Sequence, residues 1–232
     1  MLQSDLHHRI ETIREELENA ATPRWGRAPK LIAVSKNVPA EYINLAAAEG
    51  ITRLGENRVQ EILHKIPHLD ASFQIDLIGR LQSNKVKYII DKVDMIQSLD
   101  RESLAQEIDR RAQQHGRRMP VLIQVNIGHE PQKGGVSPDE VLSFLRYASK
   151  LPGLDVRGLM AVMPDLENED QLRPYFTHMR VLFDQLRCEA VSGIMMEELS
   201  MGMSSDYLIA AQEGATMVRI GSAIFGSRNA YT

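Results

Sequence analysis

Apolar residues recur along most of the chain at spacings that alternate between helical and strand-like. Near the start, Leu6, Ile10, Ile13 and Leu17 lie three or four positions apart, which predicts an amphipathic helix over residues 2–21. From Lys30 onward, short runs rich in β-branched residues alternate with helical stretches. These runs predict strands at residues 30–35, 51–54, 73–78, 94–98, 121–127, 156–162, 198–200 and 216–220.

The segments between these runs carry helical periodicity or helix-capping residues. Ser137-Pro138-Asp139-Glu140 predicts a capping box with proline in the first turn of a helix. Pro174 predicts that the long helix after residue 162 begins late or is kinked. Other helices are predicted over residues 39–50, 59–66, 84–91 and 204–213, and from Asp100.

Eight strand–helix units in 232 residues predict a parallel sheet with right-handed crossovers. That number of units closes naturally into a (β/α)₈ barrel, here with an extra helix at its start. Composition marks no domain boundary, so a single domain over residues 1–232 is expected. A doubly wound open sheet is the alternative, but neither a Gly-x-Gly-x-x-Gly motif nor a Gly-x-x-x-x-Gly-Lys-Ser/Thr loop follows any strand.

Charge and composition exclude several classes of partner. The formal net charge is −4 and the basic residues are scattered, so nucleic acid is not an expected partner. Because there is no signal peptide or membrane-spanning run, we expect a soluble, cytoplasmic protein with no membrane partner. Cys188, the one cysteine, lies on an apolar helical stripe and is predicted to be a buried, inert thiol. A monomer is expected because no exposed apolar stripe is evident.

In a parallel barrel, reactive side chains gather at the C-terminal ends of the strands. Lys36 follows the first strand and would project into the barrel mouth. Apolar walls and a neighbouring cation can depress the pKa of such a lysine and leave a nucleophilic amine. A solvated lysine at the top of a strand fits the same position equally well.

The last two strand ends carry the features of a phosphate site. Ser200–Asp206 contains Gly202 and two serines that can cap the next helix, and Arg219 is followed by the Gly221-Ser222 turn. Barrels often bind phosphate through the loops after strands seven and eight. Taken singly, each feature is explained better as an ordinary turn or a structural arginine.

Together with Lys36, these features specify an aldehyde anchor, a phosphate anchor and a cation. That set matches pyridoxal 5′-phosphate (PLP). A lysine that forms a Schiff base with a phosphorylated sugar, as in an aldolase, is an alternative. His64 and His68 lie four apart without a third ligand nearby, so a solvated helix face is expected there and no metal site is predicted.

Ordered motifs over nearly the whole chain resemble the pyridoxal phosphate homeostasis protein family, which is similar to the barrel domain of bacterial alanine racemase. One departure occurs at Asp76-Leu77-Ile78-Gly79, where relatives often have His-Phe-Ile-Gly, and it bears on the polarity near the third strand. The matching segments are Ala33–Lys36, Gly55–Arg58, Ile78-Gly79, Leu81–Lys85, Lys133–Gly135, Gly158–Met160, Leu199–Ser204, Val218–Gly221 and Ile224–Gly226.

The resemblance implies roles for individual residues. Lys36 would form the Schiff base with PLP, Asn57 would line the pocket, and Arg219 would face the pyridine nitrogen. The phosphate would be held by Ser200 with the loop that follows it and by the turn after the eighth strand, a set that comprises Ser200, Met201, Ser204, Ser205, Gly221 and Ser222.

An arginine beside the pyridine nitrogen has a chemical consequence. A guanidinium disfavours protonation of that nitrogen and weakens the ring as an electron sink. Alanine racemase adds a second domain and a partner's tyrosine, for which 232 residues of barrel leave no room. We therefore predict a protein that sequesters PLP and supplies it to PLP-dependent apoenzymes rather than an enzyme. A small PLP-dependent amino-acid racemase or decarboxylase is the alternative.

Overall fold

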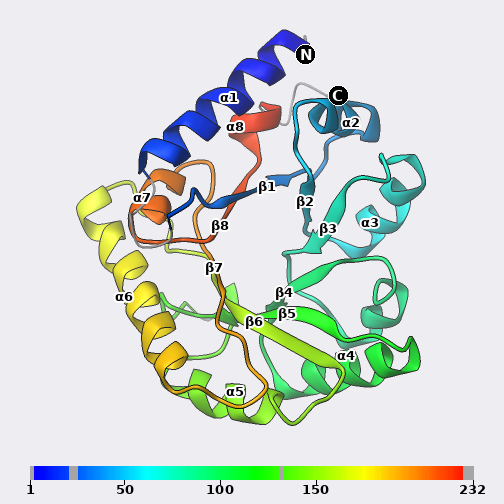
Figure 1. Cartoon of the computed structure of the whole chain (residues 1–232), viewed down its shortest axis with the longest axis vertical. Helices are drawn as coiled ribbons and strands as arrows, with labels where there is room; N and C mark the ends of the chain where they lie inside the picture. Colours follow the sequence, from blue (N-terminus) through cyan, green and yellow to red (C-terminus); the bar gives the residue numbers. More distant parts are fainter. Residues whose placement is uncertain (1–2, 21–25, 131–132, 227–232) are drawn as a thin grey trace.

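The computed structural model describes residues 3–20, 26–130 and 133–226. Its eight strands are all parallel and form one closed barrel in sequence order, with β8 pairing back onto β1 (Figure 1). The predicted barrel is thereby confirmed, and the open sheet is wrong because the sheet has no edge. The strands are β1 (Lys30–Val34), β2 (Arg53–Glu56), β3 (Gln74–Leu77), β4 (Met95–Leu99), β5 (Met119–Val125), β6 (Leu154–Ala161), β7 (Glu198–Ser200) and β8 (Met217–Ile220).

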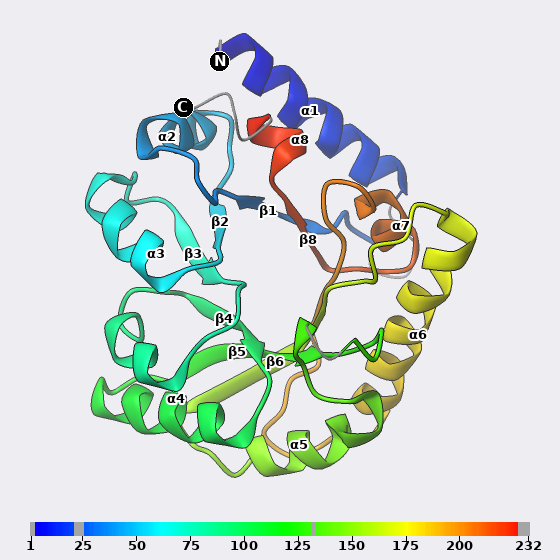
Figure 2. The same cartoon turned by 180° about the vertical axis from the view of Figure 1, so that it is seen from behind.

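The helices surround the barrel, as both views show (Figures 1 and 2). After β3 the chain forms a 3-10 helix in place of the predicted α-helix, and a short additional helix, α8, follows β8. The helical elements are α1 (Gln3–Ala20), α2 (Ala40–Ala48), α3 (Val59–Lys65), η1 (Ile66–His68), η2 (Ser83–Tyr88), α4 (Glu102–Gln114), η4 (Pro138–Glu140), α5 (Val141–Ala148), α6 (Glu169–Cys188), α7 (Tyr207–Gln212) and α8 (Ser222–Phe225).

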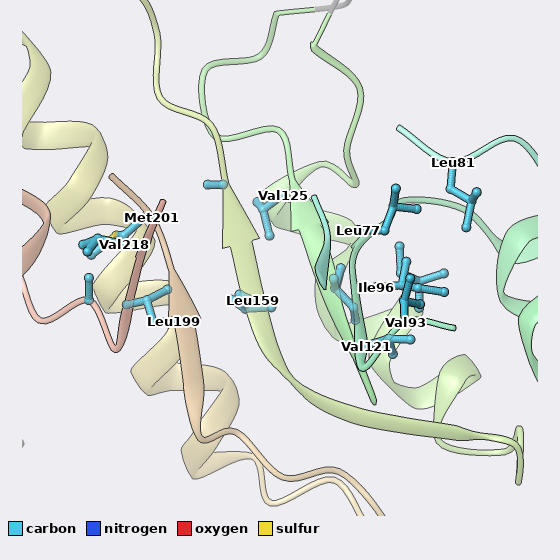
Figure 3. Close-up of a cluster of buried hydrophobic side chains, with 14 of the residues drawn as sticks. Leu77, Leu81, Val93, Ile96, Val121, Val125, Leu159, Leu199, Met201 and Val218 are labelled. Atoms are coloured by element: carbon cyan, nitrogen blue, oxygen red, sulfur yellow. The ribbon is translucent and has the colours of Figure 1, made fainter. Parts of the chain in front are cut away.

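Alternation along the strands divides the buried side chains into two clusters. A small cluster fills the barrel and comprises Ile32, Met95, Leu122, Met160 and Met217. A much larger cluster lies between the outer faces of the strands and the helices, and Figure 3 shows part of it. Because successive side chains on a strand point to opposite faces, residues two positions beyond the inner cluster face the barrel mouth.

Helix α1 packs against the elements that follow β7 and β8. Its four periodic apolar residues are all buried, as the pattern predicts, while the ends of the predicted helix at Leu2 and Ala21 lie outside the described residues. Both views place α1 alongside α7 and α8 (Figures 1 and 2). The Tyr207 hydroxyl donates a hydrogen bond to Glu16, and Arg9 Nη1 lies 3.4 Å from the carbonyl oxygen of Ile224. The extra helix therefore supports one side of the barrel mouth.

The late start predicted for α6 is wrong, whereas a helical turn does begin at Ser137 and Pro138 as predicted, but without the capping hydrogen bond. Helix α6 begins at Glu169, ahead of Pro174, because the Asn168 side chain caps it by accepting hydrogen bonds from the amides of Asp170 and Gln171. The proline removes only one intrahelical donor. At Ser137 the side chain makes no capping hydrogen bond, and the chain enters α5 through the 3-10 turn η4.

The prediction of a buried Cys188 is also wrong, since the thiol is exposed. Cys188 is the last residue of α6, and at 3.6 residues per turn it lies nearly opposite Met179 on the helix. Met179 belongs to the buried stripe, whereas Cys188 faces away from it.

The packing of α1 gives a first prediction. Replacing fully buried Ile10 with alanine should lower the free energy of unfolding by about 2–5 kcal/mol, because it removes apolar contact with the barrel and leaves a cavity. Urea unfolding followed by circular dichroism measures this. Exposed Glu15→Ala on the same helix is the control and should change stability by less than about 0.5 kcal/mol. Equal effects of the two substitutions would contradict the packing assigned to α1.

Candidate functional site

A cavity of about 460 Å³ opens at the C-terminal ends of the strands. This size suits a small organic ligand. Residues at or just beyond the ends of β1, β2, β3, β6 and β8, together with the loop after β7, line it, so the barrel brings together segments that are far apart in the sequence. The lining residues are Val34, Lys36, Asn37, Val38, Asn57, Ile78, Val162, Met203, Ser204, Ser205, Arg219, Gly221, Ser222, Phe225 and Gly226.

Strand alternation directs Lys36 into this cavity. Ile32 lies in the inner cluster, and Val34 and Lys36, two and four positions further on, both line the cavity. Ser35, between them, faces the opposite way and is fully buried behind the strand. The chain then turns sharply at Asn37, whose φ of 60° lies in the left-handed region that asparagine tolerates better than most residues.

Arg219 brings a positive charge to the floor of the cavity. Its side chain is 4% exposed, and its guanidinium donates to Ser200 Oγ and to the carbonyl oxygen of Ala161, both at 2.7 Å. Burial lowers the pKa of Arg219 to about 10, and the attraction of Asp206 opposes that shift. The guanidinium therefore keeps its charge at neutral pH.

A chain of hydrogen bonds runs from Arg219 across the barrel interior. Ser200 Oγ donates to Gln97 Oε1 at 2.7 Å, and Gln97 Nε2 donates to Asp76 Oδ2 at 2.7 Å. The Ser200 hydroxyl thereby donates its proton to Gln97 and accepts a hydrogen bond from the guanidinium. Asp76 is fully buried, and burial raises its pKa to about 6 despite Arg53 Nη1 at 3.7 Å.

The loops that follow β7 and β8 are hydrogen-bonded to each other at the cavity. Ser204 Oγ accepts hydrogen bonds from the amides of Gly221 and Ala223, at 3.1 and 3.4 Å. Gly202 lets the loop after β7 pack closely against α7, because its φ of 92° is left-handed and a Cβ there would lie 2.5 Å from Cβ of Ala210. Hydroxyls and backbone amides of two loops thus meet at one place.

The structure brings together all but two of the predicted site residues. Lys36, Asn57, Ser204, Ser205, Arg219, Gly221 and Ser222 line the cavity, whereas Ser200 and Met201 do not. The Ser200 hydroxyl is committed to Arg219 and Gln97 below the cavity. Met201 lies in the outer hydrophobic cluster, where Figure 3 places it near Val218. A direct phosphate contact by these two side chains is therefore not supported.

Two polar residues of the interior chain were missed from the sequence. Gln97 and Asp76 both lie within strand-like runs, where an inward polar side chain needs a buried partner. That signal could have marked them, but the partners that Gln97 has on β7 and β8 lie more than 100 residues away along the chain, and those of Asp76 lie on the neighbouring strands β2 and β4. Asp76 falls at the departure from the family pattern noted in the sequence, and it places a buried carboxyl on β3.

His64 and His68 are both exposed, as expected for a solvated face. Over the described ranges, no group of three or more histidine, cysteine, aspartate or glutamate side chains is placed to hold a metal ion. Within the same ranges, no helix has the length and apolar character needed to cross a bilayer.

Comparison with known proteins identifies the family. The model of the alanine racemase N-terminal domain matches residues 4–229. A pyridoxal phosphate homeostasis protein of Aquifex aeolicus is 45% identical, over 94% of this chain and 95% of the relative. The chain belongs to the pyridoxal phosphate homeostasis protein family. The Escherichia coli K12 member is 36% identical over 97% of this chain and 98% of its own length.

Solved structures agree with this assignment to the pyridoxal phosphate homeostasis protein family. PipY of Synechococcus elongatus, in a structure with PLP bound, has a TM-score of 0.84 at 34% identity and covers 95% of this chain and all of its own. Alanine racemase of Clostridium difficile has a TM-score of 0.79 at 17% identity, which shows a shared fold only. This chain covers 56% of the racemase.

The buried Asp76 gives a second prediction. Its carboxyl holds a proton more tightly in the folded chain than in the unfolded chain, because the pKa rises from 3.8 to about 6. Stability should therefore fall as pH rises from about 4 to about 7, by up to about 3 kcal/mol relative to Asp76→Asn, which cannot titrate. Urea unfolding of both proteins across this range measures the difference. Parallel pH profiles would refute the assigned protonation.

Proposed function

We propose that this chain binds PLP in the cavity at the barrel mouth, with Lys36 as the covalent anchor, and passes it on to apoenzymes that require it. One observation carries the proposal: a single cavity joins the Lys36 amine, the buried Arg219 guanidinium and the hydroxyl-bearing loops after β7 and β8. Relatives named for pyridoxal phosphate homeostasis and the PLP-bound structure of PipY support it.

The residues present fit this group. Ser204, Ser205 and Ser222 offer hydroxyls for a phosphate beside the backbone of Gly221, where the two loops meet. Lys36, on the neighbouring strand, offers the amine, and β1 and β8 pair directly. When bound, PLP supplies an aldehyde that an amine can capture and an electron-withdrawing pyridine ring. Asn57, just after β2, lines the cavity and can hydrogen-bond a ring substituent.

Arg219 favours binding over catalysis. Its guanidinium stays charged and cannot accept a proton, and placed beside the pyridine nitrogen it would oppose protonation of that nitrogen. Among the described lining residues, the ionisable side chains are Lys36 and Arg219. Neither the lining nor Arg219 provides the acid–base pair that racemisation requires. A carrier that sequesters a reactive aldehyde needs only the groups that bind the aldehyde and the phosphate.

Delivery to apoenzymes requires a site that a recipient protein can reach, and the position of the cavity at the C-terminal ends of the strands supports this part of the proposal. A cytoplasmic location and a monomeric state, both expected from the sequence, belong to this proposal. A monomer would leave the whole barrel mouth free to meet a recipient enzyme.

Covalent anchoring by Lys36 gives a third prediction. Purified protein mixed with PLP should develop visible absorbance, and borohydride followed by peptide mass spectrometry should place the ligand on Lys36. Lys36→Ala should lose both signals, while Lys92→Ala, which removes a surface lysine paired with Asp91, should keep both. Labelling of Lys36 by borohydride only when a sugar phosphate is added would instead favour an aldolase.

The assigned role of Arg219 gives a fourth prediction. With PLP bound, the protein should not racemise alanine or other amino acids above the rate of free PLP, because the lining residues that the structure describes include no acid–base pair. Chiral chromatography after long incubation measures this, with an alanine racemase as the positive control. Racemisation abolished by Lys36→Ala would establish the small racemase instead.

A further inference from the structure

An ion pair on α3, between buried Lys65 and partly buried Glu61, lies directly behind Lys36. Lys65 is 6% exposed and uses its three ammonium N–H groups on three acceptors: the Ser35 carbonyl oxygen at 2.6 Å, Glu56 Oε1 at 2.7 Å and Glu61 Oε1 at 2.8 Å. Lysine has three donors and no acceptor, so its bonding capacity here is fully used. None of these three acceptors faces the cavity.

This ion pair holds the backbone on both sides of Lys36. The Ser35 carbonyl that accepts from Lys65 belongs to the peptide bond preceding Lys36. The Asn37 amide, which belongs to the peptide bond following Lys36, donates to Glu61 Oε1 at 2.5 Å. Glu61 and Lys65 are also bonded to each other, one helical turn apart. Both peptide groups that flank Lys36 are therefore hydrogen-bonded to the same pair of side chains, Lys65 and Glu61.

The surroundings favour the ionised carboxylate of Glu61. Burial acts against ionisation of Glu61, but hydrogen bonds from Lys65 and the Asn37 amide lower its pKa overall. Burial raises the pKa of neighbouring Glu56, although Lys65 opposes this shift, and the Ser35 hydroxyl donates to Glu56 Oε1 at 2.6 Å. Removing two charges from water is costly, and well-packed apolar side chains could fill this space instead. The polar cluster thus gives the segment a fixed geometry that apolar packing would not specify.

We infer that Lys65 and Glu61 are positioning residues that fix the Ser35–Asn37 backbone so that the Lys36 amine reaches a ligand aldehyde in the cavity. The inference rests on the proposed function. The Lys36 amine condenses with the aldehyde carbon, and the aldehyde oxygen leaves as water. Because such bond formation depends steeply on placement, a small backbone shift at Lys36 weakens covalent capture while the phosphate loops, which belong to β7 and β8, still hold the ligand.

Two ligands that differ only at the reacting carbon test this inference. PLP carries the aldehyde, whereas pyridoxamine 5′-phosphate has the same ring and phosphate but an amine in its place. Lys65→Met is combined with Glu56→Gln, so that Glu56 is not left buried without its cation. This variant should bind PLP about tenfold or more weakly than the unmodified protein, and its affinity for pyridoxamine 5′-phosphate should change less than about twofold. Equilibrium dialysis measures both affinities.

Glu61→Gln is a milder second variant, which tests the inference even if the double variant does not fold. It keeps an acceptor for the Asn37 amide but loses the charge, and a smaller loss confined to PLP is expected. Arg111→Met on α4 is the matched control, since it breaks an ion pair of the same spacing to Glu107 away from the cavity, and should leave both affinities unchanged.

The outcomes separate the inference from the proposed function. Equal weakening of both ligands, or no weakening of PLP, overturns the positioning role. If the unmodified protein and Lys36→Ala bind PLP equally well, the proposed function itself fails. Loss of PLP affinity in Arg111→Met equal to that in the α3 variants would also overturn the inference, because it would reflect general destabilisation.

Discussion

The arrangement of the barrel interior depends on one buried positive charge, the guanidinium of Arg219. A charge removed from water must be compensated by hydrogen bonds or by an opposite charge. Here Ala161 and Ser200 accept from it directly, and Asp206 attracts it from the β7 loop. The Ser200 hydroxyl in turn donates a hydrogen bond to Gln97. The inward faces of β4, β7 and β8 therefore carry polar side chains, where an ordinary barrel core would be apolar.

Two structural devices therefore converge on the cavity from different sides. The polar chain through the interior fixes the guanidinium from below, and the ion pair of Lys65 with Glu61 fixes the backbone around Lys36 from outside the barrel. The side chains that hold Arg219 and the Lys36 backbone in place, among them Ser200, Gln97, Glu61 and Lys65, do not themselves line the cavity. Both devices serve residues that do line it, and this division leaves the cavity with a nucleophilic amine, a cation and hydroxyl-bearing loops.

Local sequence signals failed where a neighbouring interaction outweighed them. Pro174 disfavours a helix interior, yet the Asn168 cap and the buried stripe of α6 begin the helix five residues earlier. Cys188 was grouped with that stripe, but the helical phase turns it to solvent. Residues 84–91 were predicted to form an α-helix, but the chain forms only the 3-10 helix η2 before it reaches β4.

The sequence by itself determined the order of strands and helices, the closed barrel, and the positions at strand ends where Lys36 and Arg219 lie. These follow from periodicity and chain order, which are local properties. Only the tertiary structure decided that Ser200 serves Arg219 below the cavity and that Lys65 holds the backbone at Lys36. The physical reason is that a buried polar side chain takes its role from partners across the barrel or on a packed helix, and chain position does not specify those partners.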